Sequence, residues 1–193
     1  LPTHGAAMNY HKTGQTTAVN KAIDLLKAAQ HVVIFSGAGM SEESGIPTFR
    51  DALTGYWAQF DPMDLATPEG FASDPERVLG WYAERRAKVK ACVPHEGYEA
   101  LVNLAALKQM TVITQNVDRL HQRSGQLDVI ELHGNILEER CNVCQAMDND
   151  EPETEMPYQR FCISCDGPLR PAVVWFNESL PDAATAQAEF ALS

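Results

Sequence analysis

The sequence predicts an α/β protein built on a parallel, doubly wound sheet, with a small zinc-binding module inserted into it. Two observations support this fold class. Short apolar runs alternate with segments of helical spacing, which is typical of a parallel sheet covered by helices. Four cysteines are gathered between residues 141 and 165, in a polar stretch that interrupts the alternation. The 193 residues are enough for one sizeable core with a small satellite.

The expected strands are short apolar runs rich in β-branched residues, which favour strands over helices. They are "HVVIF" (31–35), "MTVIT" (110–114) and "VIEL" (129–132), with "AVVWF" (172–176) as a further extended run.

Helices are expected between these strands. After Thr16–Thr17, either of which can cap a helix, helical spacing is seen in the apolar residues Val19, Ala22, Ile23 and Leu26. A helix over 75–90 begins with an aspartate, a proline and a glutamate in turn, and a second helix covers 96–108. The stretch 51–74, rich in proline, glycine and aromatic residues, predicts a long functional loop with short helical pieces.

Composition excludes several classes of protein. The net charge of −11 argues against a general nucleic-acid binder, although it leaves room for an anionic cofactor bound by local amides. No apolar stretch approaches the roughly 18 residues of a membrane span, and the first residues lack the pattern of a signal peptide. From these absences and the expected free thiols we predict a cytoplasmic protein without nucleic-acid or membrane partners.

Four of the five cysteines form two C-x2-C pairs, Cys141 with Cys144 and Cys162 with Cys165. This spacing is typical of zinc sites, and four thiolates around one tetrahedral ion leave no position open for water, so the metal would be structural. Two disulfides or redox-active C-x-x-C pairs are the alternatives, which the missing secretory signal disfavours. Cys92 is left over and is interpreted as a small apolar residue near a helix end.

Each of the three strands ends in polar residues or glycine. The first runs into Gly37 and Gly39, a turn typical of dinucleotide sites, although Glu42 stands where a third glycine is usual. The second ends in residues 115–118, and the third ends in His133. In open α/β sheets the ligand lies at the carboxyl ends of the strands, so these ends predict one site. Taken singly, each has an ordinary alternative: a tight turn, a helix cap or a structural histidine.

Several motifs together resemble the sirtuins, the NAD-dependent protein lysine deacylases. They run in family order from about residue 15 to the end of the chain, and their number makes the resemblance specific. The motifs are "GAGMSEESGIPTFR" (37–50), "TQNVDRLH" (114–121), "ELHG" (131–134), the four cysteines and "VVWFNE" (173–178).

The resemblance implies a Rossmann-like NAD-binding domain made of residues 15–50, 92–136 and 171–193. It places a helical and cofactor-loop insertion at 51–91 and the zinc module at 137–170. Sirtuins carry a further nucleotide-binding strand after the last helix seen here. The Rossmann-like domain is therefore expected to be incomplete at its C-terminus, and the chain alone is expected to bind NAD poorly.

The resemblance also assigns roles in a reaction that consumes NAD. His133 would be the general base on a ribose hydroxyl, a role that suits a histidine pKa near neutrality. A short helix after Ser41 would point amides at the pyrophosphate. The products would be free lysine, nicotinamide and 2′-O-acyl-ADP-ribose. The residues expected to bind NAD are Gly37, Ala38, Gly39, Ser41, Gly45, Ile46, Pro47, Phe49, Arg50, Gln115, Asn116 and Asp118.

Acyl-lysine peptides are the implied substrates. Tyr82 and Arg85, one helical turn apart, resemble the Tyr-x-x-Arg signature of class III sirtuins, which remove succinyl and malonyl groups as well as acetyl. Ala52 would widen the acyl pocket. Two departures from the family pattern are Ser124 for a common alanine and Asn177 for a common glycine, and the second makes peptide pairing less certain. The peptide would pair as an added strand with Val173, Val174, Trp175 and Phe176.

Two other functions stay open. One is a zinc-stabilised NAD-binding module without catalysis, which the set of Asn116, Asp118 and His133 disfavours. The other is a mono-ADP-ribosyltransferase, which uses the same NAD chemistry on another acceptor and differs from a deacylase only in its products.

Overall fold

The structure, a computed structural model, describes residues 6–48, 58–148, 150, 152 and 158–193, with side chains described from residue 16 on. The chain forms two compact units, Leu1–Val32 and Val33–Ser193. Helix α1 (Ala6–Ala28) occupies most of the first unit and begins well before Thr16–Thr17. The predicted cap at those threonines is therefore wrong, because residues 6–15 already belong to the helix.

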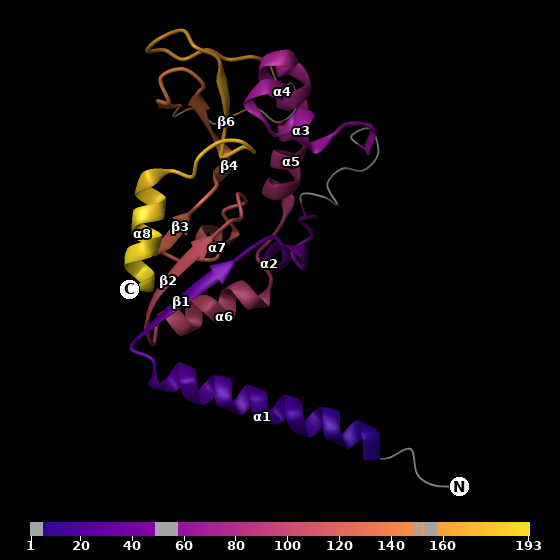
Figure 1. Cartoon of the computed structure of the whole chain (residues 1–193), viewed down its shortest axis with the longest axis vertical. Coiled ribbons are helices and arrows are strands. Elements are labelled where there is room, and N and C mark those ends of the chain that lie inside the picture. The colour runs from indigo at the N-terminus through magenta and orange to yellow at the C-terminus, as the bar shows by residue number, and fades with distance from the viewer. Residues whose placement is uncertain (1–5, 49–57, 149, 151, 153–157) are drawn as a thin grey trace, which may run out of the picture. The chain divides into compact units, whose positions relative to one another are not determined.

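The first sheet holds the three predicted strands in the order β1-β2-β3 (Figure 1). The strands are β1 (His31–Ser36), β2 (Gln109–Thr114) and β3 (Val129–Glu131). β2 and β3 pair in parallel, with Val112 opposite Val129. The Gln115 amide donates to the Ser36 carbonyl at 3.0 Å, so the carboxyl ends of β1 and β2 lie side by side. The predicted convergence of the strand ends is confirmed.

Helices cover this sheet and mark the ends of its strands. Helix α6 (Glu96–Ala105) contacts β2, and helix α8 (Asp182–Leu192) contacts β3. The core between α8 and the sheet contains Ile113, Ile130 and Ala188. Two one-turn helices, α2 (Gly39–Glu42) and α7 (Leu120–Arg123), follow the carboxyl ends of β1 and β2.

A second, antiparallel sheet follows directly after β3, in the order β5-β4-β6. Its strands are β4 (Gly134–Cys141), β5 (Met147–Asp148) and β6 (Leu169–Val173). Sequence analysis did not predict β4, and only the first two residues of the run 172–176 belong to β6. β4 lacks a regular apolar alternation because the polar residues Asn135 and Glu139 occupy buried positions in it.

The buried charge of β4 is Glu139, which is only 5% exposed. Its carboxylate lies 3.0 Å from Nη1 of Arg160 and 3.5 Å from Nη2 of Arg86. Burial raises the pKa of Glu139, and the two guanidinium groups oppose that rise. Arg86 also donates from Nε to the Ile136 carbonyl at 2.9 Å. The two Arg86 bonds connect helix α5 (Pro75–Ala91) to the second sheet.

Three helices pack against the second sheet: α3 (Pro62–Leu65), α4 (Pro68–Ser73) and α5 (Pro75–Ala91). The Asp74 carboxylate accepts from the Arg77 amide at 3.0 Å, so the predicted start of the long helix is confirmed. Trp81 and Tyr82 of α5 are buried together with Trp175 in one apolar core. Within the described ranges, no helix has the length and apolar character needed to cross a bilayer.

Candidate active site and metal cluster

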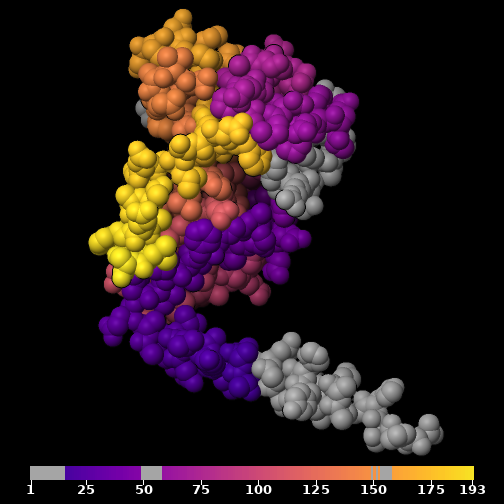
Figure 2. All heavy atoms as spheres, viewed as in Figure 1, coloured from indigo at the N-terminus to yellow at the C-terminus, as the bar shows by residue number. Residues whose placement is uncertain are grey.

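A pocket of about 810 Å³ opens at the carboxyl ends of the first sheet. It brings together segments that are far apart in the sequence, and Figure 2 shows the yellow segment after β6 crossing the face of the unit between the orange module and the first sheet. The predicted site residues that line the pocket are Ala38, Ser41, Ile46, Pro47, Tyr82, Arg85, Gln115, Asn116, Asp118, His133, Val173, Val174, Trp175 and Phe176.

The predicted glycines border this pocket without lining it. A Cβ atom built on Gly37 or Gly39 would meet nothing within 4 Å, so space for a ligand adjoins the backbone there. Gly45 lines a neighbouring hollow together with Lys88. The short helix begins at Gly39 and contains Ser41, so the prediction of a helix after Ser41 is wrong. Among the predicted residues, Phe49, Arg50 and Ala52 lie outside the described residues.

His133 stands where the chain passes from the first sheet into the second. Its Nδ1 lies 3.0 Å from the carbonyl oxygen of Gln115. A carbonyl only accepts, so Nδ1 carries the proton and Nε2 keeps a lone pair. The side chain is partly exposed and lines the pocket. This tautomer is the one that a general base needs.

Gly134 explains why a glycine follows this histidine. Its φ is +66°, and a Cβ atom there would lie 2.1 Å from the Ala172 carbonyl oxygen. The close approach lets β6 pair with the first residue of β4, where Gly134 stands opposite Val173. A side chain at this position would push apart the two strands that flank the histidine.

A buried polar cluster forms one wall of the pocket. Ser41 donates from Oγ to Oδ2 of Asp118 at 2.6 Å, and Asn116 donates from Nδ2 to Ser41 Oγ and to the Gly37 carbonyl, both at 3.0 Å. Oδ1 of Asp118 accepts the Leu120 amide at 2.9 Å. Asp118 therefore accepts a hydrogen bond from the first turn of helix α7, as the alternative reading of a helix cap predicted. It also accepts the hydroxyl proton of Ser41 and so fixes that side chain. Both amide protons of Asn116 are used, which leaves its Oδ1 as an acceptor.

Behind this wall lie residues that sequence analysis missed. Tyr98 is fully buried, and its hydroxyl lies 3.0 Å from Ser41 Oγ. Burial raises the pKa of Tyr98 to about 12, so the phenol stays protonated. His121 lies 2.9 Å from Ser36 Oγ, which donates to Thr114 Oγ1. The histidine must then donate from Nε2, and burial lowers its pKa. The one sequence signal for His121 is its place at the end of the motif "TQNVDRLH" (114–121).

The two predicted acyl-recognition residues lie together in the pocket. The guanidinium of Arg85 stands 4.5 Å from the ring centre of Trp81 and 5.8 Å from that of Tyr82. Burial lowers the pKa of Arg85 and raises that of Tyr82. Tyr82 accepts a hydrogen bond from Nε1 of Trp175 at 2.9 Å. Lys88, which sequence analysis missed, also lines the pocket one turn after Arg85.

The segment after β6 uses most of its own amides. The Val174 amide donates to the His133 carbonyl at 2.9 Å, and the Phe176 amide donates to the Ala66 carbonyl at 3.0 Å. The Trp175 amide donates to Oε2 of Glu178 at 2.8 Å. Asn177 has a φ of +67°, which favours glycine and tolerates asparagine. The departure from the glycine that sirtuins commonly have here therefore fits the local backbone.

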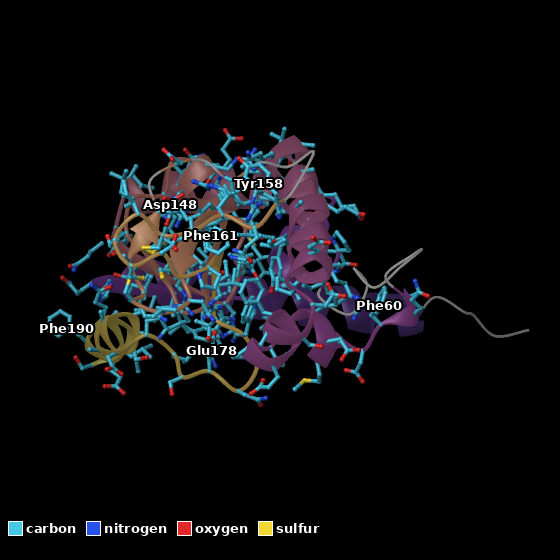
Figure 3. The ribbon with its side chains drawn as sticks, turned by 90° about the horizontal axis from the view of Figure 1, so that it is seen from above. Phe60, Asp148, Tyr158, Phe161, Glu178 and Phe190 are labelled. Atoms are coloured by element: carbon cyan, nitrogen blue, oxygen red, sulfur yellow. The ribbon has the colours of Figure 1, made fainter. Side chains whose placement is uncertain are left out.

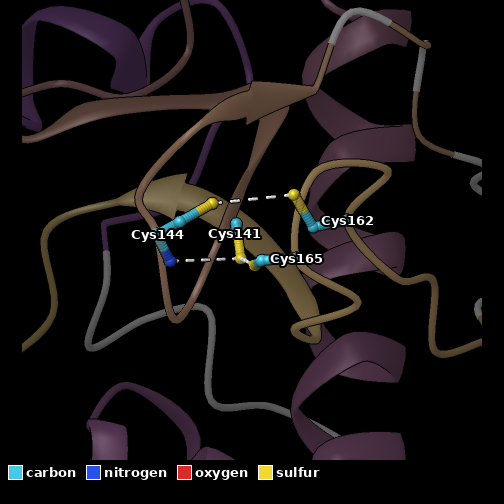
Figure 4. Close-up of side chains that lie close together, drawn as sticks. All are labelled: Cys141, Cys144, Cys162 and Cys165. Atoms are coloured by element: carbon cyan, nitrogen blue, oxygen red, sulfur yellow. Dashed lines mark hydrogen bonds between the residues drawn. The ribbon is translucent and has the colours of Figure 1, made fainter.

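The four predicted metal ligands form one cluster (Figure 4), and each contributes a sulfur atom within 4.8 Å of the others. Cys141 and Cys165 have sulfurs 3.4 Å apart, and Cys144 and Cys162 have sulfurs 3.7 Å apart. Zn–S bonds of about 2.3 Å in a tetrahedron separate sulfurs by about 3.8 Å, so the cluster fits a zinc ion. All four cysteines are free, which rules out the disulfide alternative for this structure.

Backbone groups complete the cluster. The amides of Val143 and Cys144 donate to the Cys141 sulfur at 3.3 and 3.4 Å. Burial opposes the thiolate, but these amides lower the pKa of Cys141 to about 6. A Cβ atom on Gly167 would lie 2.9 Å from the same sulfur, so only glycine fits at this turn. Zinc held here has no open coordination position and supports the fold of the module.

The fold and the site define a class of protein. It combines a ligand pocket at the carboxyl ends of parallel strands, a histidine with an available Nε2, and a closed cluster of four thiols. A family model described as the Sir2 family matches residues 37–192, and the chain belongs to this family. The predicted family and fold class are confirmed.

Known relatives agree with this assignment. A protein of Methylococcus capsulatus named NAD-dependent protein deacylase is 48% identical over 170 residues, which cover 82% of this chain and 66% of that protein. The crystal structure of a Sir2 homolog–NAD complex matches with a TM-score of 0.83 and 40% identity, covering 90% of this chain and 68% of the other.

A third relative was solved with a peptide. It is a Sir2 structure in complex with an inhibitor, 2′-O-acetyl-ADP-ribose and a deacetylated peptide. It matches with a TM-score of 0.69 and 31% identity, covering 89% of this chain and 70% of the other. The chain thus spans about two thirds of the length of the relatives it matches.

Proposed function

We propose that the protein carrying this chain is an NAD-dependent protein-lysine deacylase. It would release nicotinamide and transfer the acyl group of a modified lysine to ADP-ribose, as a transferase and hydrolase of acyl-lysine. The relatives are enzymes named for this activity or solved with NAD or its acylated product. The observation that carries the proposal is His133, which enters the pocket with Nδ1 bonded to the Gln115 carbonyl and Nε2 available.

In this proposal His133 removes a proton from a ribose hydroxyl. NAD, when bound, supplies the ribose carbon that the acyl oxygen of the substrate attacks as nicotinamide leaves. The Gln115 carbonyl accepts the Nδ1 proton and so leaves Nε2 of the neutral imidazole free to take the proton. A positioned base of this kind typically contributes ~10²–10⁴-fold to a rate.

The polar wall would orient the cofactor. Asn116 has spent both amide protons on Gly37 and Ser41, so its remaining oxygen suits a donor such as a hydroxyl or a carboxamide. Asp118 also offers acceptor capacity. Ala38, Ile46 and Pro47 would form the rest of the cofactor surface. The open space beside Gly37 and Gly39 suits close approach of a pyrophosphate.

The substrate peptide would lie along Val173–Phe176. Amides of this segment are engaged within the protein, whereas the Val174 carbonyl has no hydrogen-bond partner among the described residues. An added strand would therefore use this carbonyl and the apolar side chains of the segment more than its amides. Recognition of this kind reads the peptide backbone and tolerates many sequences.

The acyl group in this proposal includes acidic acyls, succinyl and malonyl, besides acetyl. Arg85 carries a positive charge beside the ring of Tyr82, and both line the pocket. A guanidinium and a phenol offer a carboxylate a planar fork and one further donor. An acetyl group has no carboxylate and would leave these donors unused.

Product analysis tests the proposed function. The full-length protein is incubated with NAD and acetyl- or succinyl-lysine peptide, and the products are followed over time by mass spectrometry. A deacylase yields 2′-O-acyl-ADP-ribose and free lysine in equal amounts with nicotinamide. ADP-ribose attached to a protein acceptor, with the acyl-lysine intact, would instead identify an ADP-ribosyltransferase and overturn the proposal.

A cytoplasmic location belongs to the same proposal. The four thiols must stay reduced to hold a metal ion, and reducing compartments maintain them. Cell fractionation followed by immunoblotting is the test, and recovery of the protein in an oxidising compartment would contradict it.

A further inference from the structure

The hydrogen bond between Trp175 and Tyr82 has a fixed direction. An indole N–H only donates, so the Tyr82 oxygen is the acceptor of the 2.9 Å contact with Nε1. The phenol then keeps its own proton for another partner. Among the described residues, no other side chain or backbone group forms a hydrogen bond with this oxygen. Tyr82, whose hydroxyl proton is available in this way, lines the pocket.

Trp175 is itself held from several sides. Its ring lies under the guanidinium of Arg170, whose central carbon is 4.0 Å from the ring centre. Phe71 packs on it with ring centres 5.4 Å apart. Glu178, labelled in Figure 3, accepts the Trp175 amide and pairs with both Arg170 and Arg140. Trp175 and Arg170 are 3% and 1% exposed, so the indole has little freedom to turn.

Tyr82 has equally little freedom. It is 3% exposed, and its ring meets Trp81 edge-on with centres 4.8 Å apart. Burial keeps its pKa above the ordinary value, so the hydroxyl remains a donor at neutral pH. With its oxygen facing an N–H on one side, the hydroxyl proton must turn to another direction, and the pocket with Arg85 is the open side.

We infer that Trp175 is a positioning residue: its indole N–H orients the Tyr82 hydroxyl as a donor to the acyl group, and thereby favours acidic acyl groups over acetyl. Arg170 and Glu178 hold the indole in place and act through it. This inference rests on the proposed deacylase function and adds to it a determinant of acyl selectivity outside the Tyr82–Arg85 pair.

The first test removes the donor and keeps the ring. Trp175→Phe in the full-length protein should lower the ratio of kcat/KM for a succinyl-lysine peptide to that for the matched acetyl-lysine peptide about 3- to 10-fold, the size of one hydrogen bond. The ratio is the readout because any loss of peptide binding along Val173–Phe176 is shared by the two peptides. Equal losses on the two peptides would overturn the inference.

A double-mutant cycle tests whether Trp175 acts through Tyr82. If it does, Trp175→Phe should cause no further loss of desuccinylation once Tyr82→Phe has removed the hydroxyl. Additive losses would mean that Trp175 merely supports the fold, and the inference would fall. Phe71→Leu is the control, since it disturbs the packing of the indole without removing either partner of the hydrogen bond. It should affect both peptides alike.

A measurement without turnover keeps the inference separate from the proposed function. The Nε1–H resonance of Trp175 in a ¹⁵N-labelled protein, assigned by its loss in Trp175→Phe, should move upfield in Tyr82→Phe. An unmoved resonance would overturn the inference even if desuccinylation is found. If the wild-type protein removed no acyl group at all, the proposed function would fail, and with it the selectivity assigned to Trp175, whatever the resonance showed.

Discussion

The cysteine cluster and the strand-end pocket are two sites built in opposite ways. The cluster takes all four ligands from one segment, and backbone amides and a glycine complete it. The pocket draws its residues from the turns after β1 and β2, from α5, from the β3–β4 junction, and from the end of β6 and the segment after it. The first is closed. The second is open, and Asn116, Asp118 and His133 keep hydrogen-bonding capacity for a ligand.

This difference separates a structural site, the cysteine cluster, from a site that can take part in a reaction, the pocket. Four thiolates that satisfy one ion leave nothing to react, so the cluster can only hold its module together. Asn116 and His133 each donate to a backbone carbonyl, Asn116 from Nδ2 and His133 from Nδ1. Each keeps an acceptor atom available, Oδ1 in Asn116 and Nε2 in His133. A site of this second kind depends on correct packing of both sheets.

The largest effect is expected from the cluster. Cys141→Ala should unfold the metal module, because structural zinc is worth ~10–16 kcal/mol of apparent binding energy in small peptides. Thermal unfolding and zinc content of the purified, reduced protein would show it. Cys92→Ala, outside the cluster, is the matched control and should keep one zinc per chain. Purified protein without zinc, or a Cys141→Ala variant of unchanged stability, would contradict this account.

The next effect lies in the pocket. His133→Ala should reduce deacylation by ~10²–10⁴-fold, the usual contribution of a general base, while the fold stays intact. NAD affinity, measured by calorimetry, should persist because His133 is only one of many groups around the pocket. Near-normal turnover in the variant would show that another group is the base.

A smaller effect concerns selectivity. Arg85→Met should lower desuccinylation by roughly 10- to 100-fold, since a charge-assisted hydrogen bond is worth ~1.5–3 kcal/mol. Deacetylation should fall much less. Arg77→Met is the matched control, because Arg77 lies on the same helix and pairs with Asp74 instead of lining the pocket. Equal losses on succinyl and acetyl peptides would assign Arg85 to the fold.

The smallest effect is on stability against pH. Burial lowers the pKa of His121 below its ordinary 6.5. Below pH 6.5 His121 binds a proton more readily in the unfolded chain than in the folded chain. The free energy of unfolding must therefore fall as the pH falls. Each pH unit costs at most ~1.4 kcal/mol from this group. Urea unfolding at pH 7 and 5.5 should therefore show a weaker pH dependence in His121→Gln; parallel curves for both proteins would refute it.

Sequence alone located the cysteine cluster because its ligands, spacing and chemistry are local. The strands of the first sheet were also predictable, since each is a short apolar run. β4 was not, because Glu139 is buried by pairing with Arg86 and Arg160, and such pairing is invisible in periodicity. Arg170 is a similar case. Arg170 is a single charged residue within a buried strand, so a sequence reader could have expected it to have a charged partner. Sequence spacing could not have shown that this partner is Glu178.

His133 also has a mechanical role as a joint between the two sheets. Its ring is tied to Gln115 at the end of β2, and its own carbonyl is tied to the Val174 amide just after β6. A movement of one sheet relative to the other would lengthen or break one of these two hydrogen bonds. The histidine and the segment expected to hold the peptide are therefore joined by a direct backbone hydrogen bond. This bond sets the spacing between the base and the chain along which the peptide would lie.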